Sequence, residues 1–330
     1  MKRTAVFCPG RGSYTEASLG SLPAGHPFVE RAEELRRAAG LESLVALDSA
    51  ERFEPGRHLK PSNVSLLIYV ASMIDGVEVL ETERVVCVGG NSLGWYTSLA
   101  LAGSLSFEDG FRLVQTMALL QEDAGGGGQV LYPLIDADWI PSAELTARVE
   151  RVMQAAGGDV MPSIHLGGFT VLAGNDAGVA RLLRDLEKHK LGKVTYPFRL
   201  AQHGPYHTSL VAGVAQKAKE QLASLTFEVP RVTLIDGRGA RFTPFSTDLE
   251  ALADYTLGAQ VVTPYDFTTS VRVALCEYAP ERISLLRPGN TLGGICGQVL
   301  VAERWAGVAS KADFDELQAG PAPLIDSRGR

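Results

Sequence analysis

A serine between two glycines forms the most suggestive chemical pattern of the chain, Gly-Asn-Ser-Leu-Gly at residues 90–94. An apolar run at 85–88 precedes it and a helix-compatible stretch at 95–102 follows. A strand, a sharp turn and a helix in this order lift a serine hydroxyl clear of a sheet. Glycines suit such a turn because a Cβ there collides with neighbouring backbone, and the helix start offers N–H groups to a developing oxyanion. The pattern predicts that Ser92 is a nucleophile, and the flanking elements argue against a chance match in a chain with 35 glycines.

A nucleophilic serine needs a base, which is usually histidine. Three of the six histidines stand in polar or charged surroundings typical of a surface, namely His26, His58 and His189. His203 and His207 lie in a loop that opens a helix. Their spacing could suggest a metal pair, but Gly204-Pro205 between them prevents the helix that would align both rings. We therefore predict no metal site. The pattern alone makes His207 a candidate base without deciding the matter.

The bulk composition excludes several classes of protein. The 330 residues are 45% hydrophobic and 21% charged, with a net charge of −7 and no basic run, which argues against nucleic-acid binding. The apolar run at 4–8 is too short for the core of a signal peptide. The sequence has no uninterrupted run of about 18 apolar residues, so no membrane span is predicted. Four cysteines without a Cys-x-x-Cys spacing are interpreted as reduced thiols of a cytoplasmic protein.

Alternating strand and helix patterns predict an α/β fold with an insertion. Four glycines at 125–128 indicate a linker, and residues 129–199 follow the order β-α-β-β-α-β, with the last strand at 193–200, which is typical of a ferredoxin-like unit. Strand and helix patterns resume afterwards. We expect a large α/β subdomain at 1–127 and 200–315, a small ferredoxin-like subdomain at 128–199, and a tail at 316–330 that is poorly ordered from Ala319 onward.

Together these motifs resemble the malonyl-CoA:acyl carrier protein transacylase family, which includes the acyltransferase domains of fatty acid and polyketide synthases. The similarity covers about residues 3–305. The matching segments are Phe-Cys-Pro-Gly-Arg-Gly-Ser at 7–13, the elbow at 90–94, Ala-Gly-Ser-Leu-Ser at 102–106, Arg-Leu-Val at 112–114, Thr-Val-Leu-Ala-Gly at 170–174, Tyr-His-Thr at 206–208, Gln-Val-Val-Thr-Pro at 260–264 and Arg-Pro-Gly-Asn-Thr-Leu at 287–292. The resemblance implies an α/β-hydrolase-like large subdomain around the inserted ferredoxin-like one.

The resemblance also implies a mechanism and its partners. Ser92 would be acylated by a thioester, with His207 as its base and the backbone carbonyl of Gln260 orienting the imidazole. The N–H groups of Leu93 and Arg11 would form the oxyanion hole. The substrate would be an acyl-CoA or acyl-phosphopantetheine, the acceptor an acyl carrier protein, and no cofactor would be tightly bound.

The chain departs from the family pattern around the expected substrate pocket. Met117 stands where malonyl members carry an arginine that binds the substrate carboxylate, which indicates an uncharged acyl group unless another arginine does that work. Arg11 replaces a glutamine, and it could assist the oxyanion, bind a CoA phosphate or point to solvent. Asn91 replaces a histidine, and Tyr206 belongs to a segment linked to acyl choice. His165 replaces an asparagine beside the pocket, where a structural role competes with substrate contact.

Three functions remain open at this point. The leading hypothesis is an acyltransferase that loads an uncharged or atypical acyl group onto a carrier protein, in polyketide or fatty acid biosynthesis. The second is a hydrolase that removes acyl groups from carrier proteins with the same serine and histidine. The third is a carrier-binding scaffold without efficient catalysis, which the presence of both Ser92 and His207 disfavours. A dinucleotide-dependent oxidoreductase is excluded, because Gly10-x-Gly12 lacks the third glycine and the acidic residue of that fingerprint.

Overall fold

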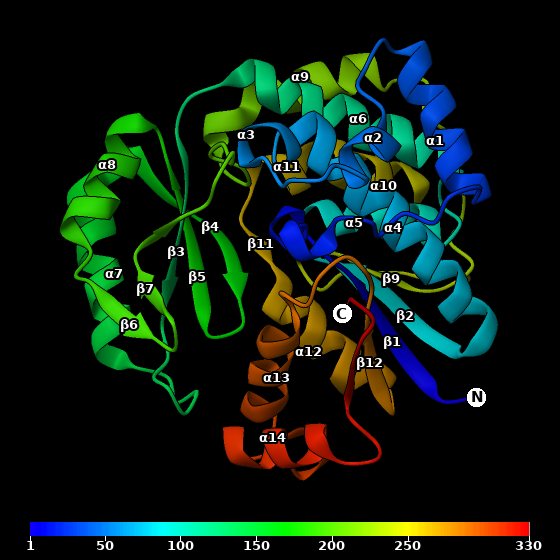
Figure 1. The fold of residues 1–330 in the computed structure, drawn as a ribbon. Helices are drawn as coiled ribbons and strands as arrows, with labels where there is room; N and C mark the ends of the chain where they lie inside the picture. Colours follow the sequence, from blue (N-terminus) through cyan, green and yellow to red (C-terminus); the bar gives the residue numbers. More distant parts are fainter. Residues whose placement is uncertain (330) are drawn as a thin grey trace.

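The structure, a computed structural model, describes residues 1–329 and contains two separate main sheets. The larger sheet has the strand order β10-β9-β2-β1-β12-β13, and the smaller has the order β11-β4-β5-β3-β8. Figure 1 shows the smaller sheet with its helices on the left and the larger sheet on the right. The predicted mixed α/β fold is confirmed.

The larger sheet is parallel along its central strands. Its strands are β1 (Arg3–Cys8), β2 (Arg84–Gly90), β9 (Leu234–Ile235), β10 (Arg241–Phe242), β12 (Arg282–Leu285) and β13 (Ile325–Ser327). β1 pairs in parallel with both β2 and β12, and only β9 and β10 are antiparallel. Because β1 and β2 lie at the centre, the loops that follow them meet at the same edge of the sheet. These loops carry Arg11 and Ser92.

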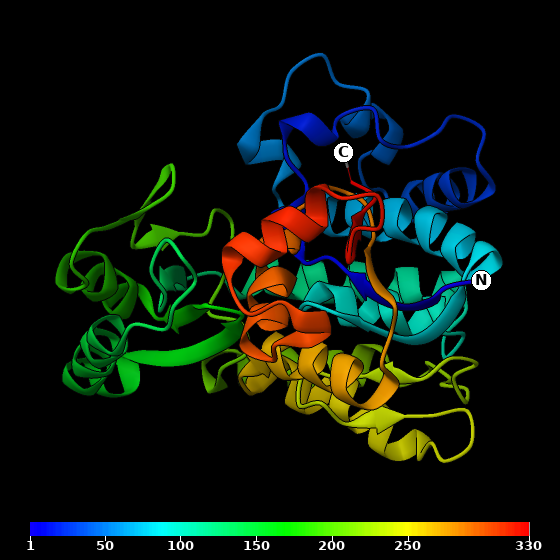
Figure 2. The same cartoon turned by 90° about the horizontal axis from the view of Figure 1, so that it is seen from below.

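Helices cover both faces of the larger sheet. α4 (Pro61–Thr82) and α5 (Leu93–Leu101) lie on one side, and α12 (Phe267–Tyr278) and α13 (Gly293–Ala302) lie on the other (Figures 1 and 2). α6 (Phe107–Ala124) packs against α4, α5 and α9 (Ala212–Gln221). Ser106 is the N-cap of α6, because its hydroxyl accepts a hydrogen bond from the Asp109 N–H.

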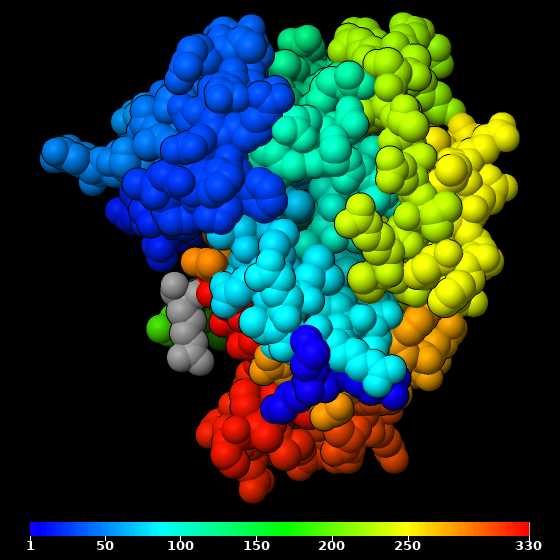
Figure 3. All heavy atoms as spheres, turned by 90° about the vertical axis from the view of Figure 1, so that its right-hand side faces the viewer, coloured from blue at the N-terminus to red at the C-terminus, as the bar shows by residue number. Residues whose placement is uncertain are grey.

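Within the described residues, the larger part contains six further α-helices. They are α1 (Pro27–Ala38), α2 (Leu44–Asp48), α3 (Pro55–His58), α10 (Leu249–Asp254), α11 (Gln260–Val262) and α14 (Lys311–Ala319). The space-filling view shows the N-terminal segments in blue and α4 in cyan on one continuous face (Figure 3). By length and composition α4 could cross a bilayer, but 78% of its most apolar window is buried inside the protein, as in the core helix of a globular fold.

The smaller sheet and its helices follow the element order predicted for the insertion as far as α8. Its elements are β3 (Gly128–Pro133), α7 (Ala143–Ala156), β4 (Val160–Leu166), β5 (Phe169–Gly174), α8 (Asp176–Asp185) and β8 (Phe198–Arg199). α7 and α8 enclose a second apolar core with the sheet. The subdomain boundaries stay a prediction, and the sheet also includes β11 (Tyr265–Asp266), which pairs in parallel with β4 from a distant part of the chain.

Two local predictions were wrong. The single strand expected at 193–200 is instead a hairpin of β6 (His189–Leu191) and β7 (Val194–Tyr196), followed by the short β8. The poor order expected beyond Ala319 is contradicted by β13, which pairs in parallel with β12. The Arg328 guanidinium that follows forms an ion pair with the buried Asp75, so the C-terminal segment is part of the core.

Candidate active site

Ser92 lies in the turn between β2 and α5, in a strained backbone conformation. Its φ and ψ are 56° and −106°, in a region that residues with a Cβ rarely adopt. The two glycines of the motif are required by close contacts: a Cβ on Gly90 would overlap the backbone of Gly94, and a Cβ on Gly94 would overlap the carbonyl of Cys8. β1, β2 and α5 therefore meet too closely for any other residue, which explains the spacing of the motif.

His207 reaches the same point from the segment that leaves the smaller sheet. It also has a positive φ, 59°, and its N–H donates to the carbonyl of Val261 at 3.0 Å. The preceding residue is held from the smaller sheet, because the Ser163 hydroxyl on β4 donates to the Tyr206 carbonyl at 2.8 Å. Both sheets thus contribute to the position of the imidazole.

A chain of two hydrogen bonds joins Ser92, His207 and Gln260. The Nδ1 of His207 lies 2.7 Å from the backbone carbonyl oxygen of Gln260, and its Nε2 lies 2.7 Å from the Oγ of Ser92. A carbonyl oxygen can only accept, so Nδ1 carries the proton and Nε2 is free to accept from the serine hydroxyl. The resulting tautomer is the one that a general base requires.

Sequence reasoning missed the second contact of Gln260 and its neighbour Tyr96. The Gln260 side chain donates from Nε2 to the carbonyl of Ser92 at 3.2 Å and accepts at Oε1 from the Tyr96 hydroxyl at 2.7 Å. Gln260 follows a π-helical turn, Tyr255–Ala259, which is a feature often found at functional sites. Only the position of Tyr96 on the first turn of the helix after the elbow could have suggested its role.

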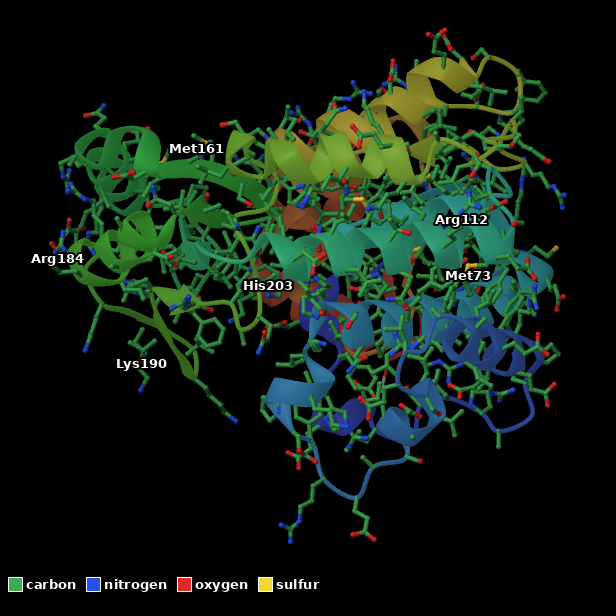
Figure 4. All side chains as sticks on the ribbon, turned by 90° about the horizontal axis from the view of Figure 1, so that it is seen from above. Met73, Arg112, Met161, Arg184, Lys190 and His203 are labelled. Atoms are coloured by element: carbon green, nitrogen blue, oxygen red, sulfur yellow. The ribbon has the colours of Figure 1, made fainter. Side chains whose placement is uncertain are left out.

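Burial keeps His207 neutral at physiological pH. Desolvation lowers the pKa of His207 to about 4; the hydrogen bond to the Gln260 carbonyl opposes this shift and the nearby charge of Arg11 adds to it. His203 has its pKa lowered to about 3, again chiefly by desolvation and then by Arg11. The Nδ1 of His203 donates to the Ala201 carbonyl at 2.7 Å, and in Figure 4 this residue lies between the smaller sheet and the helices of the larger part.

A narrow cavity of about 20 Å³, partly open to solvent, is formed around Ser92 and His207. The predicted residues that line it also include Arg11, Leu93, Met117, Tyr206 and Gln260. The residues that sequence reasoning did not anticipate there are Ser65, Tyr96, Val114, Ala118, Gln121 and Val261. Within residues 1–329 the backbone N–H groups of Leu93 and Arg11 donate no hydrogen bond, so both are available beside the serine.

Two predicted pocket residues are not brought to this cavity. Asn91 is half-buried beside Gly10, and its side-chain amide lies near that glycine rather than in the cavity wall. His165 is exposed on β4, where it pairs in register with Asp266 of β11. Its assignment to the pocket is corrected, because the strand turns this side chain to the surface.

Curated proteins are similar in sequence to almost the whole chain. No protein-family model matches the chain. The chain is 24% identical over 325 residues to the malonyl CoA-acyl carrier protein transacylase of Haemophilus influenzae, covering 96% of this chain and 99% of that protein. It is 26% identical over 308 residues to the enzyme of the same name from Escherichia coli K12, covering 91% and 94%. The chain is therefore similar to malonyl CoA-acyl carrier protein transacylases over almost its whole length.

Solved structures of transacylases and related domains have the same fold as this chain. The malonyl-CoA:ACP transacylase of Synechocystis sp. PCC 6803 superposes with a TM-score of 0.77 at 18% identity, covering 100% of this chain and 98% of that one. A malonyl-transacylase in complex with a type II polyketide synthase acyl carrier protein superposes with a TM-score of 0.73 at 23% sequence identity, covering 91% of this chain and 93% of that one. The acyltransferase domain from the second module of the salinomycin polyketide synthase superposes with a TM-score of 0.72 at 20% sequence identity, covering 99% of this chain and 69% of that one. The transacylase fold therefore extends to polyketide synthase domains.

Proposed function

We propose that this protein transfers an acyl group from a thioester to the phosphopantetheine thiol of an acyl carrier protein through a Ser92 acyl-enzyme. One observation carries the proposal: the Ser92 Oγ lies 2.7 Å from the His207 Nε2, in a tautomer fixed by the Gln260 carbonyl. Serine activated by a positioned, neutral histidine is the arrangement of acyl-transfer enzymes that form covalent intermediates.

In the first half-reaction His207 acts as a base and then as an acid. Its Nε2 takes the proton of Ser92 while the Oγ attacks the thioester carbonyl carbon. The carbonyl oxygen becomes an oxyanion, which accepts hydrogen bonds from the free N–H groups of Leu93 and Arg11. The carbon–sulfur bond then breaks, and His207 gives the proton that it took from Ser92 to the departing thiolate. An acyl ester on Ser92 remains.

The second half-reaction runs through the same atoms in reverse. The thiol of the incoming phosphopantetheine gives its proton to His207, its sulfur attacks the acyl ester, and the Ser92 oxygen leaves and recovers the proton. The similarity to transacylases supports a carrier protein as acceptor and a CoA thioester as donor, in fatty acid or polyketide biosynthesis. The four cysteines are free thiols, three of them buried, which suits a protein of the reducing cytoplasm.

The acyl group is not held as the resemblance describes for malonyl members. Met117 is 2% exposed and lines the cavity, and its thioether cannot form the bidentate pair that an arginine forms with a carboxylate. This position supports an acyl group other than malonyl. The buried Arg11 lines the same cavity and favours a negatively charged ligand instead, since a buried cation without an anion is costly.

Intact-protein mass spectrometry tests the transfer reaction. The protein is mixed with a panel of acyl-CoAs and then with an acceptor carrier protein, and Ser92→Ala is compared with Ser224→Ala, an exposed serine near Arg112. We expect an adduct that moves to the carrier in the native protein and in Ser224→Ala, and none in Ser92→Ala. Loss of substrate to free acid without transfer would establish the alternative, a hydrolase with the same serine and histidine. An adduct that persists in Ser92→Ala would refute the mechanism.

A further inference from the structure

Arg11 is a buried cation whose hydrogen-bond donors are unused. Only 8% of its surface is exposed, and within residues 1–329 neither Nη1 nor Nη2 has a hydrogen-bond acceptor. No carboxylate of the described chain forms an ion pair with it. Buried guanidinium groups are normally paired, because taking a charge out of water is costly unless its donors are satisfied.

Another arginine shows how this protein treats the same group elsewhere. Arg36 is 1% exposed, and four acceptors surround its guanidinium at 2.7–2.8 Å: the carbonyls of Glu42 and Ser62 and the side chains of Gln115 and Asn63. The fold therefore supplies acceptors to all three nitrogens of a buried guanidinium where the residue is structural. The unused donors of Arg11 indicate that its acceptor is a ligand.

The direction of the Arg11 side chain leaves these donors available to the cavity. Its guanidinium carbon lies 4.4 Å from the centre of the Tyr206 ring, and both residues line the cavity that contains Ser92 and Met117. Stacking on an aromatic ring covers one face of the guanidinium but leaves the N–H groups in its plane unoccupied. Those N–H groups form a fork that matches a carboxylate.

We propose that Arg11 binds a carboxylate on the acyl group, so that the preferred substrates are thioesters of dicarboxylic acids anchored from the segment after β1 instead of from α6, where Met117 stands at the usual arginine position. The proposal rests on the acyl transfer proposed above and names its substrate class. Met117 does not oppose it, because a thioether fails to attract a carboxylate but does not repel one. Arg11 decides the charge of the ligand, since only an anion offsets its burial.

The other anions available to a guanidinium fit this position less well. The oxyanion exists only during reaction, whereas the charge of Arg11 must be compensated throughout binding. The phosphates of CoA are separated from the thioester by the whole pantetheine arm, whereas Arg11 lines the same cavity as the reacting serine. A carboxylate on the acyl chain is the anion that enters with the reacting carbonyl.

Binding of this carboxylate would also affect the base. Arg11 contributes to the low pKa of His207, since a nearby positive charge disfavours an imidazolium. A carboxylate paired with Arg11 cancels that charge and makes His207 a stronger base when the correct acyl group is present. Selection would therefore act on the acylation rate as well as on binding.

The test compares acyl groups that differ in charge but little in shape. Malonyl is paired with acetoacetyl, in which a methyl replaces one carboxylate oxygen, and succinyl is paired with 4-oxopentanoyl. Each is supplied both as a CoA thioester and as an N-acetylcysteamine thioester, which lacks the phosphates. The rate of adduct formation on Ser92 is measured in the native protein, Arg11→Gln, Arg11→Lys and the double variant Arg11→Gln/Met117→Arg. Glutamine keeps the backbone N–H at position 11, and circular dichroism checks the fold of each variant.

We expect the native protein to prefer the carboxylated member of a pair, and Arg11→Gln to reduce that preference by about 30-fold or more, the scale for loss of one partner of a buried charge pair. Arg11→Lys should keep part of the preference, and the double variant should restore it from position 117 on α6. Equal labelling by both members in the native protein, or an equal loss for both in Arg11→Gln, would overturn the proposal. A loss confined to CoA thioesters would assign Arg11 to the phosphates instead. No adduct from any thioester would contradict the acyl transfer itself.

Discussion

Ser92 and His207 both have left-handed backbone conformations, with φ of 56° and 59°, and their side chains meet at 2.7 Å between Oγ and Nε2. Each such conformation costs on the order of 1–3 kcal/mol and persists only where the surrounding structure enforces it. At Ser92 the enforcement comes from the close approach of β1, β2 and α5, and at His207 from hydrogen bonds to Val261 and to the smaller sheet. The backbone strain at Ser92 and His207 therefore lies at the two residues whose side chains form the nucleophile–base hydrogen bond.

His207→Gln should lower the rate of acylation about 10²–10⁴-fold, because the Ser92 hydroxyl loses its general base. His203→Gln is the matched control: this histidine is four residues away and also bonds a backbone carbonyl, but it does not line the cavity with Ser92. We expect His203→Gln to retain most of the activity. Pre-steady-state labelling of Ser92 measures both, and an equal loss in the two variants would count against His207 as the base.

The acid limb of the pH–rate profile should follow His207. Its pKa is lowered to about 4, and the neutral form is the active one, so kcat/KM should be constant at neutral pH and fall as the pH drops through about 4. Arg11→Gln removes a charge that lowers this pKa and should move the limb to higher pH. Profiles measured with a neutral acyl-CoA test both points, and a limb that does not move in the variant would show that Arg11 does not influence the base.

Tyr96→Phe should reduce both stability and turnover. The change leaves the buried Oε1 of Gln260 without its donor, which costs about 1–3 kcal/mol of the free energy of unfolding. It also loosens the residue that orients His207, so kcat should fall while KM changes little. Tyr132→Phe is the control, because its hydroxyl donates to the Glu187 carbonyl far from the cavity. Urea unfolding and steady-state kinetics separate the effects, and a kcat loss in both variants would make the role of Tyr96 merely structural.

Gly94→Ala should destabilise the fold and not only the site. Its Cβ would overlap the Cys8 carbonyl, and backbone cannot move aside as a side chain can, so we expect a loss of about 3 kcal/mol or more in the free energy of unfolding. Gly213→Ala on α9 meets no atom within 4 Å and should be neutral or stabilising by about 0.5 kcal/mol. Urea unfolding measures the free energy of unfolding of both variants. A Gly94→Ala protein as stable as the native one would contradict the close packing of Gly94 against Cys8.

Elements with strong local patterns could be predicted from the sequence, and elements made by distant pairing could not. The strand before Ser92 and the helix after it were recognised because an apolar run that ends in glycines is a local signal. β13 has only three residues and exists because it pairs with β12, so the Pro/Gly-rich sequence around it predicted disorder. The hairpin of β6 and β7 pairs locally, but each strand has only three residues, too few for an alternating pattern to be recognised.

The sequence by itself determined which residue types are available for acyl transfer: a serine in a glycine elbow, a histidine after a Gly-Pro break, and a methionine in place of an arginine. Only the tertiary structure decided which of them meet. It joined Ser92 to His207 and Gln260, added Tyr96, left His165 exposed, and buried Arg11 without an acceptor beside the serine. The physical reason is that burial and hydrogen-bond partners depend on elements more than a hundred residues apart, whereas a sequence motif reports only local backbone geometry.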